Sequence, residues 1–388
     1  SRQNLELTRT IREGRKMGSL LGVIDQTRTS MGGRLLRWNL EQPLVDQTAI
    51  QLRQDVVARF ADDTSLRLEV QELLDEVYDL ERLMGRLAVG TGNARDLKAL
   101  CTSLAVIPRV KELISDMSDV LLSQIADQLI PLDDLTDLIT NAIVDNPPIS
   151  LREGGVIKEG FNRELDELRS ASRDGKTWIK NLEAAERERT GIKSLKVGFN
   201  KVFGYYIEVT NPNLALVPPD YQRKQTLTNA ERFITPELKE KEALVLGADE
   251  RMVEAEYQLF CDIRDRAKEY IKEIQTNAHA LAFLDMLQSL GETAVRNHYV
   301  RPEITSDTSL EIVQGRHPVV ETLQSGFVPN DVYFSEAERI VLLTGPNMAG
   351  KSTYLRQTAL IVILAQVGSF VPAQSAKIGL VDKIFTRI

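Results

Sequence analysis

The stretch Gly345-Pro346-Asn347-Met348-Ala349-Gly350-Lys351-Ser352-Thr353 fits G-x-x-x-x-G-K-[ST], the pattern of a phosphate-binding loop. An apolar run from Ile340 to Leu343 precedes it and predicts a buried parallel strand. A helical pattern from Ser352 to Val367 follows it. Because the motif is flanked by a strand and a helix, this stretch predicts an α/β nucleotide-binding fold around it.

Each residue type in the loop suits a bound phosphate. Gly345 and Gly350 let the backbone turn its N–H groups inward, and the following helix presents its positive end. Lys351 supplies a full charge, and the Ser352 hydroxyl suits Mg²⁺. The loop therefore predicts ATP or ADP with Mg²⁺, and the alternative is a chance glycine turn. The candidate nucleotide-binding residues are Gly345, Pro346, Asn347, Met348, Ala349, Gly350, Lys351, Ser352 and Thr353.

Composition bounds the class of protein. The 388 residues suffice for two or three domains, and 43% hydrophobic with 27% charged residues indicates a soluble globular chain. No apolar stretch approaches the length of a membrane span, and Ser1 opens no signal-peptide pattern. The only cysteines, Cys101 and Cys261, are far apart, which favours a reduced, cytoplasmic protein. The net charge of −8 excludes a uniformly basic surface.

The first 145 residues read as a helical core. Apolar residues from Leu66 to Leu87 recur at helical spacing and predict one helix, which Gly90 and the following residues end. Further helices are predicted over Ala94–Leu104 and Val110–Leu129, with Pro108 as the break between them.

A helical arm with a β-tip follows. After Pro147-Pro148, a helix is predicted over Phe161–Arg189. Three strands are then predicted, over Ser194–Phe199, Tyr205–Val209 and Gln222–Thr228. Thr235-Pro236 begins a very long helix, on the order of 75–80 Å. Gly247 is its internal weak point and Gly291 its expected end.

The β-tip is basic within an acidic chain. Between Thr190 and Thr235 there are six lysines and arginines against three acidic residues. Such a set suits phosphate oxygens better than base edges, although an incidental cap on a coiled coil remains the alternative. The candidate DNA-binding residues are Lys193, Lys196, Asn200, Lys201, Arg223, Lys224, Asn229 and Arg232.

Several long motifs resemble the bacterial MutS family of DNA mismatch-recognition ATPases. They are Thr29–Leu36, Glu188–Gly191, Leu195–Asn200, Gly204–Ile207, Arg223–Arg232, Gly315–Glu321, Thr344–Leu360 and Gly368–Ala373. The resemblance implies a mainly α fold with a small β-rich clamp and a partial P-loop ATPase domain of the ABC type. It divides the chain into a core (1–145), an outgoing lever (146–190), a clamp (191–235), a returning lever with core (236–300) and the first part of the ATPase domain (301–388).

The resemblance also implies function. Family members are homodimers that grip double-stranded DNA, hydrolyse ATP and work with a MutL-type partner at the bacterial nucleoid. Phe327 matches the aromatic residue that stacks on adenine. The family's Phe-x-Glu wedge, acidic magnesium strand and signature loop have no match here. We therefore expect a fragment with weak DNA binding and negligible hydrolysis. The alternatives are a non-enzymatic architectural DNA clamp and an ABC/SMC-type coiled-coil ATPase without a mismatch role.

Overall fold

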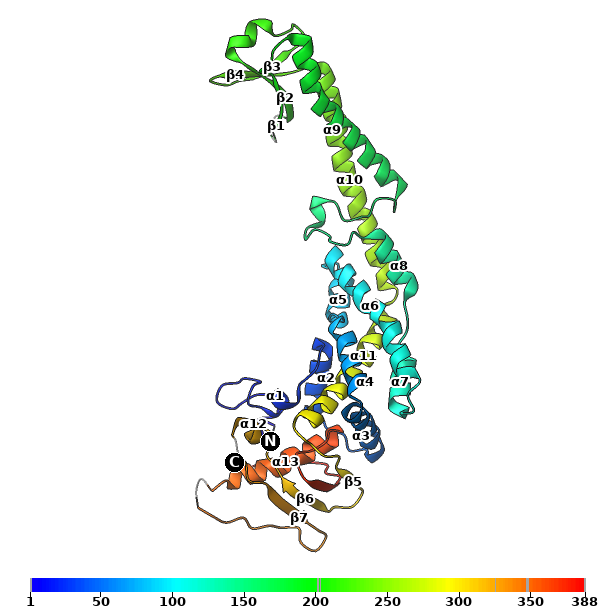
Figure 1. Cartoon of the computed structure of the whole chain (residues 1–388), viewed down its shortest axis with the longest axis vertical. Coiled ribbons are helices and arrows are strands. Elements are labelled where there is room, and N and C mark those ends of the chain that lie inside the picture. The colour runs from blue at the N-terminus through cyan, green and yellow to red at the C-terminus, as the bar shows by residue number, and fades with distance from the viewer. Residues whose placement is uncertain (1, 201, 203, 325, 347–348, 387–388) are drawn as a thin grey trace. The chain divides into compact units, whose positions relative to one another are not determined.

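The computed structural model describes residues 2–200, 202, 204–324, 326–346 and 349–386. The chain divides into two compact units (Figure 1). The first unit comprises Ser1–Gly92, Ala99–Thr136 and Lys268–Ile388, and the second comprises Asn93–Lys98 and Asp137–Ala267. Throughout the described ranges, every helix is too short or too polar to cross a membrane.

The helices of the first unit surround α11 (Ile271–Arg296). Leu281, Leu284 and Leu287 of α11 are fully buried, because the helix is covered on several sides. The covering helices are α1 (Leu20–Ile24), α2 (Ser30–Glu41), α3 (Gln47–Asp62), α4 (Thr64–Asp75), α5 (Leu80–Ala88) and α7 (Val120–Gln128). Two further helices, α6 (Ala94–Ser115) and α8 (Asp133–Ala142), have residues in both units.

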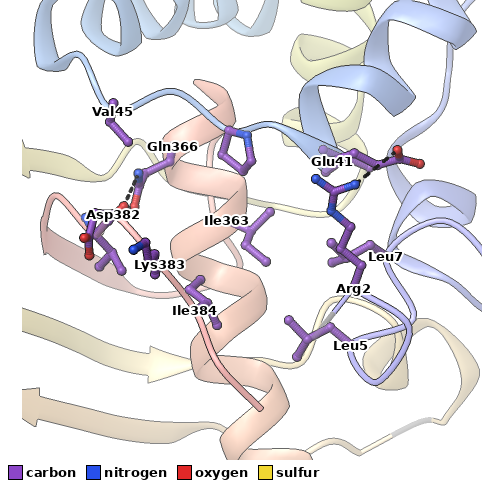
Figure 2. A pocket seen from close by; sticks show the side chains of 13 residues that line it. Arg2, Leu5, Leu7, Glu41, Val45, Ile363, Gln366, Asp382, Lys383 and Ile384 are labelled. Atoms are coloured by element: carbon purple, nitrogen blue, oxygen red, sulfur yellow. Dashed lines mark hydrogen bonds and ion pairs between the residues drawn. The ribbon is translucent and has the colours of Figure 1, made fainter.

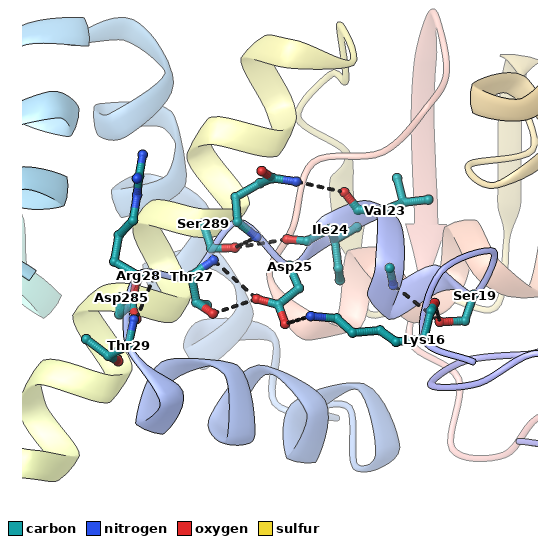
Figure 3. Close-up of polar contacts among 12 residues, drawn as sticks. Lys16, Ser19, Val23, Ile24, Asp25, Thr27, Arg28, Thr29, Asp285 and Ser289 are labelled. Carbon is teal, nitrogen blue, oxygen red and sulfur yellow. Dashed lines mark hydrogen bonds and ion pairs between the residues drawn. The ribbon is translucent and has the colours of Figure 1, made fainter. Parts of the chain in front are cut away.

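A buried carboxylate anchors α2 to α11 (Figure 3). Asp285 of α11 accepts hydrogen bonds from the backbone N–H groups of Arg28 and Thr29, at 2.9 and 2.7 Å, and from the Thr29 hydroxyl at 2.7 Å. Thr29 in turn caps α2 by accepting the Gly32 N–H at 2.9 Å. A Cβ on Gly32 would lie 2.2 Å from the Asp285 carboxylate, so this contact requires glycine.

The first unit also carries a mixed sheet with the strand order β5-β8-β6-β7. Its strands are β5 (Glu303–Thr305), β6 (Leu310–Gly315), β7 (Asn330–Phe334) and β8 (Ser375–Gly379), with the short α12 (Val320–Leu323) before β7 and α13 (Lys351–Val367) before β8. Strand β5 is parallel to β8, and the other pairs are antiparallel. Buried Arg53 of α3 donates to the Val367 carbonyl at 2.9 Å, which ties α13 to the helices.

The second unit consists of two long helices with a sheet at their end (Figure 1). Its elements are the 3₁₀ turns at Leu151–Glu153 and Asn211–Leu216, α9 (Arg163–Thr190), β1 (Lys196–Asn200), β2 (Gly204–Thr210), β3 (Gln222–Thr226), β4 (Ala230–Ile234) and α10 (Pro236–Lys268). Arg169 of α9 pairs with buried Glu256 of α10 at 2.7 Å, so the two helices lie side by side. The sheet is antiparallel in the order β1-β2-β4-β3.

The expectation of a mainly α fold with a small β-rich tip is confirmed, and several helix boundaries are corrected. The single helix predicted from Leu66 to Leu87 is two helices, because Asp79 accepts the Arg82 N–H and begins α5. Pro108 does not break α6, whose neighbouring side chains Ile107 and Val110 are fully buried and hold the helix together.

The long returning helix is also two helices. Helix α10 ends at Lys268 and α11 begins at Ile271, whereas Gly247 interrupts nothing. Gly291 does not end α11. A Cβ there would lie 2.6 Å from Phe60 of α3, so this glycine permits close helix packing. The three predicted tip strands are present within a residue or two, but β4 was not predicted.

Candidate DNA-binding module and nucleotide loop

The tip of the second unit, residues 191–235, is here called the β-module. Ile207 and Val209 of β2 are fully buried at its centre, together with Leu195. Ile179 and Leu182 of α9 and Leu238 and Val245 of α10 complete this apolar cluster. The four strands are therefore fixed to both helices by a core of their own.

Every acidic residue of the β-module has a cationic partner. The pairs are Glu208–Arg232, Asp220–Arg189 and Glu231–Arg223, each at 3.0 Å. Arg232 also lies over the Tyr206 ring, 4.1 Å from its centroid. Two predicted DNA-binding arginines, Arg223 and Arg232, are therefore engaged within the module.

Two of the predicted lysines leave positive charge at the surface of the module. Lys193 and Lys196 are exposed, and neither forms an ion pair with a residue that the structure describes. Lys224 and Asn229 are exposed as well, and Asn200 is half-buried at the end of β1. Lys201 lies outside the described residues. The module thus keeps positive charge at its surface after all of its carboxylates are paired.

The predicted phosphate loop leads into α13. Gly350, with φ of +89°, precedes Lys351, and the Lys351 ammonium donates to the carbonyls of Gly345 and Pro346. Ser352 is exposed and Thr353 half-buried in the first turn of α13, and the Ala349 N–H donates to Pro346 at 3.4 Å. Phe327 is half-buried in the loop between α12 and β7. Asn347 and Met348 lie outside the described residues.

The prediction of a buried strand before this loop is wrong. Residues 340–343 form no strand, and the side chains of Ile340 and Leu342 are 90% and 87% exposed. A strand needs a neighbouring strand to accept and donate its backbone hydrogen bonds. In the described part of the chain no strand pairs with this run.

A polar cluster at the start of α12 was not predicted from the sequence. The Nδ1 atom of buried His317 accepts hydrogen bonds from the N–H groups of Val319 and Val320, both at 3.3 Å. Burial, aided by the charge of Arg356, lowers the pKa of His317 to about 4. Arg316 pairs with Glu321 at 2.6 Å. The motif Gly315–Glu321 marked this segment, but spacing alone does not reveal a buried neutral imidazole.

A cavity of about 270 Å³ in the first unit contains none of the predicted site residues. Figure 2 shows it between the segment of Leu5 and Leu7, the end of α2, and Ile363 of α13. Gln366 closes one side by donating to the carbonyls of Leu44 and Val381 at 2.7 and 2.9 Å. The described residues contain no group of three His, Cys, Asp or Glu side chains that could hold a metal ion.

Comparison with known proteins decides the family. The model of MutS domain III matches residues 1–291, and that of MutS domain V matches residues 341–388. The chain belongs to the MutS family. Relatives named DNA mismatch repair protein MutS include those of Acetivibrio thermocellus (56% identical), Ruminiclostridium cellulolyticum (54%) and Halothermothrix orenii (54%).

These MutS relatives match the chain along its whole length. The alignments cover 100% of this chain but only 44–45% of each relative. The chain therefore spans less than half the length of the curated relatives it matches. The domain III match includes the β-module, and the domain V match includes the phosphate loop.

Proposed function

We propose that this chain supplies the backbone-gripping clamp, the lever helices and the ATP phosphate loop of a DNA mismatch-repair protein. The relatives that align with the whole of this chain are named DNA mismatch repair protein MutS. In this proposal 1–145 is the core, 146–190 and 236–300 carry the levers, 191–235 is the clamp and 301–388 begins the ATPase domain. The partners are double-stranded DNA, a second copy of the protein and a MutL-type protein, in the bacterial cytoplasm at the nucleoid.

The observation that carries the DNA-binding proposal is the charge of the β-module. All of its acidic residues form ion pairs, two with arginines of the module and Asp220 with Arg189 of α9, while Lys193 and Lys196 remain exposed just before β1 and at its start. Exposed ammonium groups on a rigid sheet attract phosphate oxygens without reading sequence. The proposed ligand is therefore the duplex backbone.

The nucleotide proposal assigns ATP and Mg²⁺ to the loop. The N–H groups at the start of α13 and the Lys351 ammonium would hold the phosphates, and Ser352 would hold Mg²⁺. Lys351 would first have to leave the carbonyls of Gly345 and Pro346. Hydrolysis by this chain alone is expected to be negligible.

A second candidate is a non-enzymatic DNA clamp. The exposed run 340–343 beside the loop favours it, because a phosphate loop without its strand is poorly organised for catalysis. ATP turnover after mixing with a complementary C-terminal piece of a relative, abolished by Lys351→Ala, would favour the ATPase. No turnover in any combination would favour the clamp.

Salt dependence tests the DNA-binding proposal. Charge reversal in K193E/K196E should weaken duplex binding roughly 10- to 100-fold and reduce the slope of log K against log salt by about two. The matched control K272E/K383E reverses two exposed lysines of the first unit and should change the affinity far less. Equal losses in both variants would remove the β-module from the DNA path.

A further inference from the structure

Two backbone N–H groups of the β1–β2 hairpin donate hydrogen bonds to carboxylates of the long helices. The Val197 N–H donates to Glu183 of α9 at 2.9 Å. The Tyr205 N–H donates to Glu242 of α10 at 3.2 Å. The hairpin is thus held on one side by each helix.

The strand register explains why these amides are available. Strand β1 is an edge of the sheet, so the Val197 N–H that points away from β2 has no strand beyond it. On the other side of β2, the pairing of Ile207 with Phe233 would place Thr235 opposite Tyr205. Strand β4 has ended there, because Thr235 caps α10 by accepting the Leu238 N–H at 3.2 Å. Each carboxylate replaces an acceptor that a neighbouring strand would have supplied.

Residues next to Glu183 and Glu242 support these two hydrogen bonds. Gly204 has φ of +74°, and a Cβ on it would lie 1.5 Å from the Glu242 carboxylate oxygen. Only glycine leaves room for that side chain. The second oxygen of Glu183 pairs with Arg187 at 2.7 Å, and Arg187 also donates to the Leu195 carbonyl at 2.7 Å. Side chains of α9 therefore hold both the start of β1 and the residue before it.

We propose that Glu183 and Glu242 are positioning residues that orient the β1–β2 hairpin for contact with DNA. This inference rests on the proposed function of the β-module. Lys196, a proposed phosphate contact, is the residue before Val197. The hydrogen bond from the Val197 N–H to Glu183 therefore fixes the backbone next to Lys196. A carboxylate near a phosphate-binding surface weakens binding by repulsion. The negative charge of the two glutamates should therefore weaken DNA binding, whereas their hydrogen bonds to the hairpin should strengthen it. Variants that remove the charge but keep the hydrogen bonds separate these two effects.

Three double variants of the 388-residue chain, each lacking two negative charges, make that separation. E183A/E242A removes charge and acceptor, and E183Q/E242Q removes charge but keeps an acceptor. The control E188A/E240A removes two exposed glutamates of the same helices. We expect E183A/E242A to bind duplex about tenfold more weakly than the control, and E183Q/E242Q to bind as the control does. Equal affinity of all three would overturn the proposal.

Amide hydrogen exchange tests the hydrogen bonds without DNA. The Val197 and Tyr205 amides should exchange faster in E183A/E242A, and as in wild type in E183Q/E242Q. Unchanged exchange in the alanine variant would contradict the positioning role. If that variant fails to fold, E183D/E242D keeps both charges on shorter side chains, and it should show the same faster exchange and weaker binding. Wild-type chain without duplex affinity would overturn the proposed function, while exchange would still decide whether the glutamates hold the hairpin.

Discussion

The β-module and the phosphate loop both carry motifs that resemble the family, yet the structure organises them differently. The β-module has four paired strands, an apolar core and internal ion pairs. At the phosphate loop, the run 340–343 is unpaired and exposed, and Lys351 turns onto the carbonyls of the loop itself. The strands of the β-module are all paired and share a core, whereas the segment before the phosphate loop has no strand partner.

The difference shows what each motif needs. The strands of the β-module find their hydrogen-bond partners within 45 residues of sequence and their apolar partners on the two adjoining helices. A strand before a phosphate loop needs neighbouring strands, and none of the described strands pairs with residues 340–343. The β-module can therefore present a rigid binding surface, whereas the loop has the residues of its site without the supporting sheet. The following four predictions challenge or sharpen this contrast.

The largest expected effect concerns the helices of the first unit, which should be as firmly organised as the β-module. Asp285→Ala empties a fully buried site, leaves the N–H groups of Arg28 and Thr29 without this acceptor, and should lower the free energy of unfolding by roughly 3–5 kcal/mol. The chain has two tryptophans, Trp38 in the first unit and Trp178 in the second. Urea unfolding followed by Trp38 in a W178F background measures the loss. Exposed Asp127→Ala is the control, and a loss below about 1 kcal/mol for Asp285→Ala would contradict the anchoring role.

The next effect concerns the hairpin of the β-module. Gly204→Ala adds the strain of a positive φ and displaces the Glu242 carboxylate, so it should destabilise the second unit by about 2–3 kcal/mol. Gly191→Ala, also at positive φ but with open space around its Cβ, should cost only about 1 kcal/mol. Trp178 fluorescence in a W38F background measures both. Equal losses would mean that the Glu242 contact contributes nothing.

The third effect is acid sensitivity confined to the first unit. The pKa of His317 is about 4 in the folded chain and about 6.5 in the unfolded chain. Between these two pH values the unfolded chain binds a proton at His317 and the folded chain does not, so acid favours unfolding. His317 should therefore lower the unfolding free energy of this unit by about 2 kcal/mol between pH 7 and pH 5. His317→Asn keeps an acceptor for the Val319 and Val320 amides and should remove that part of the pH dependence. The same pH profile in both chains would assign the sensitivity elsewhere.

The smallest effect is expected at the phosphate loop. The Lys351 ammonium bonds only exposed carbonyls, so Lys351→Ala should change the unfolding free energy of the first unit by less than about 0.5 kcal/mol. Trp38 in the W178F background again provides the measurement. A loss above about 1 kcal/mol would show that the loop is more tightly built into the first unit than the exposure of residues 340–343 indicates.

Features that depend on local residue chemistry were predictable from the sequence. The N-cap at Thr235, the tip strands and the mainly helical class follow from spacing and turn residues within short windows. Features that depend on distant partners were not. Strand β4 was missed because it leads directly into α10, and the roles of Asp285, Glu183 and Glu242 appear only when segments far apart in the sequence are brought together. The same limit explains the wrong strand at 340–343, whose apolar pattern says nothing about whether a neighbouring strand is present.

Amide hydrogen exchange of the whole chain, with and without a short fully paired DNA duplex at low salt, tests the central claim most directly. The account predicts slower exchange on DNA addition in the strands of the β-module, between Lys193 and Thr226, and unchanged exchange at 340–353. Slower exchange confined to the first unit, with the β-module unaffected, would contradict it.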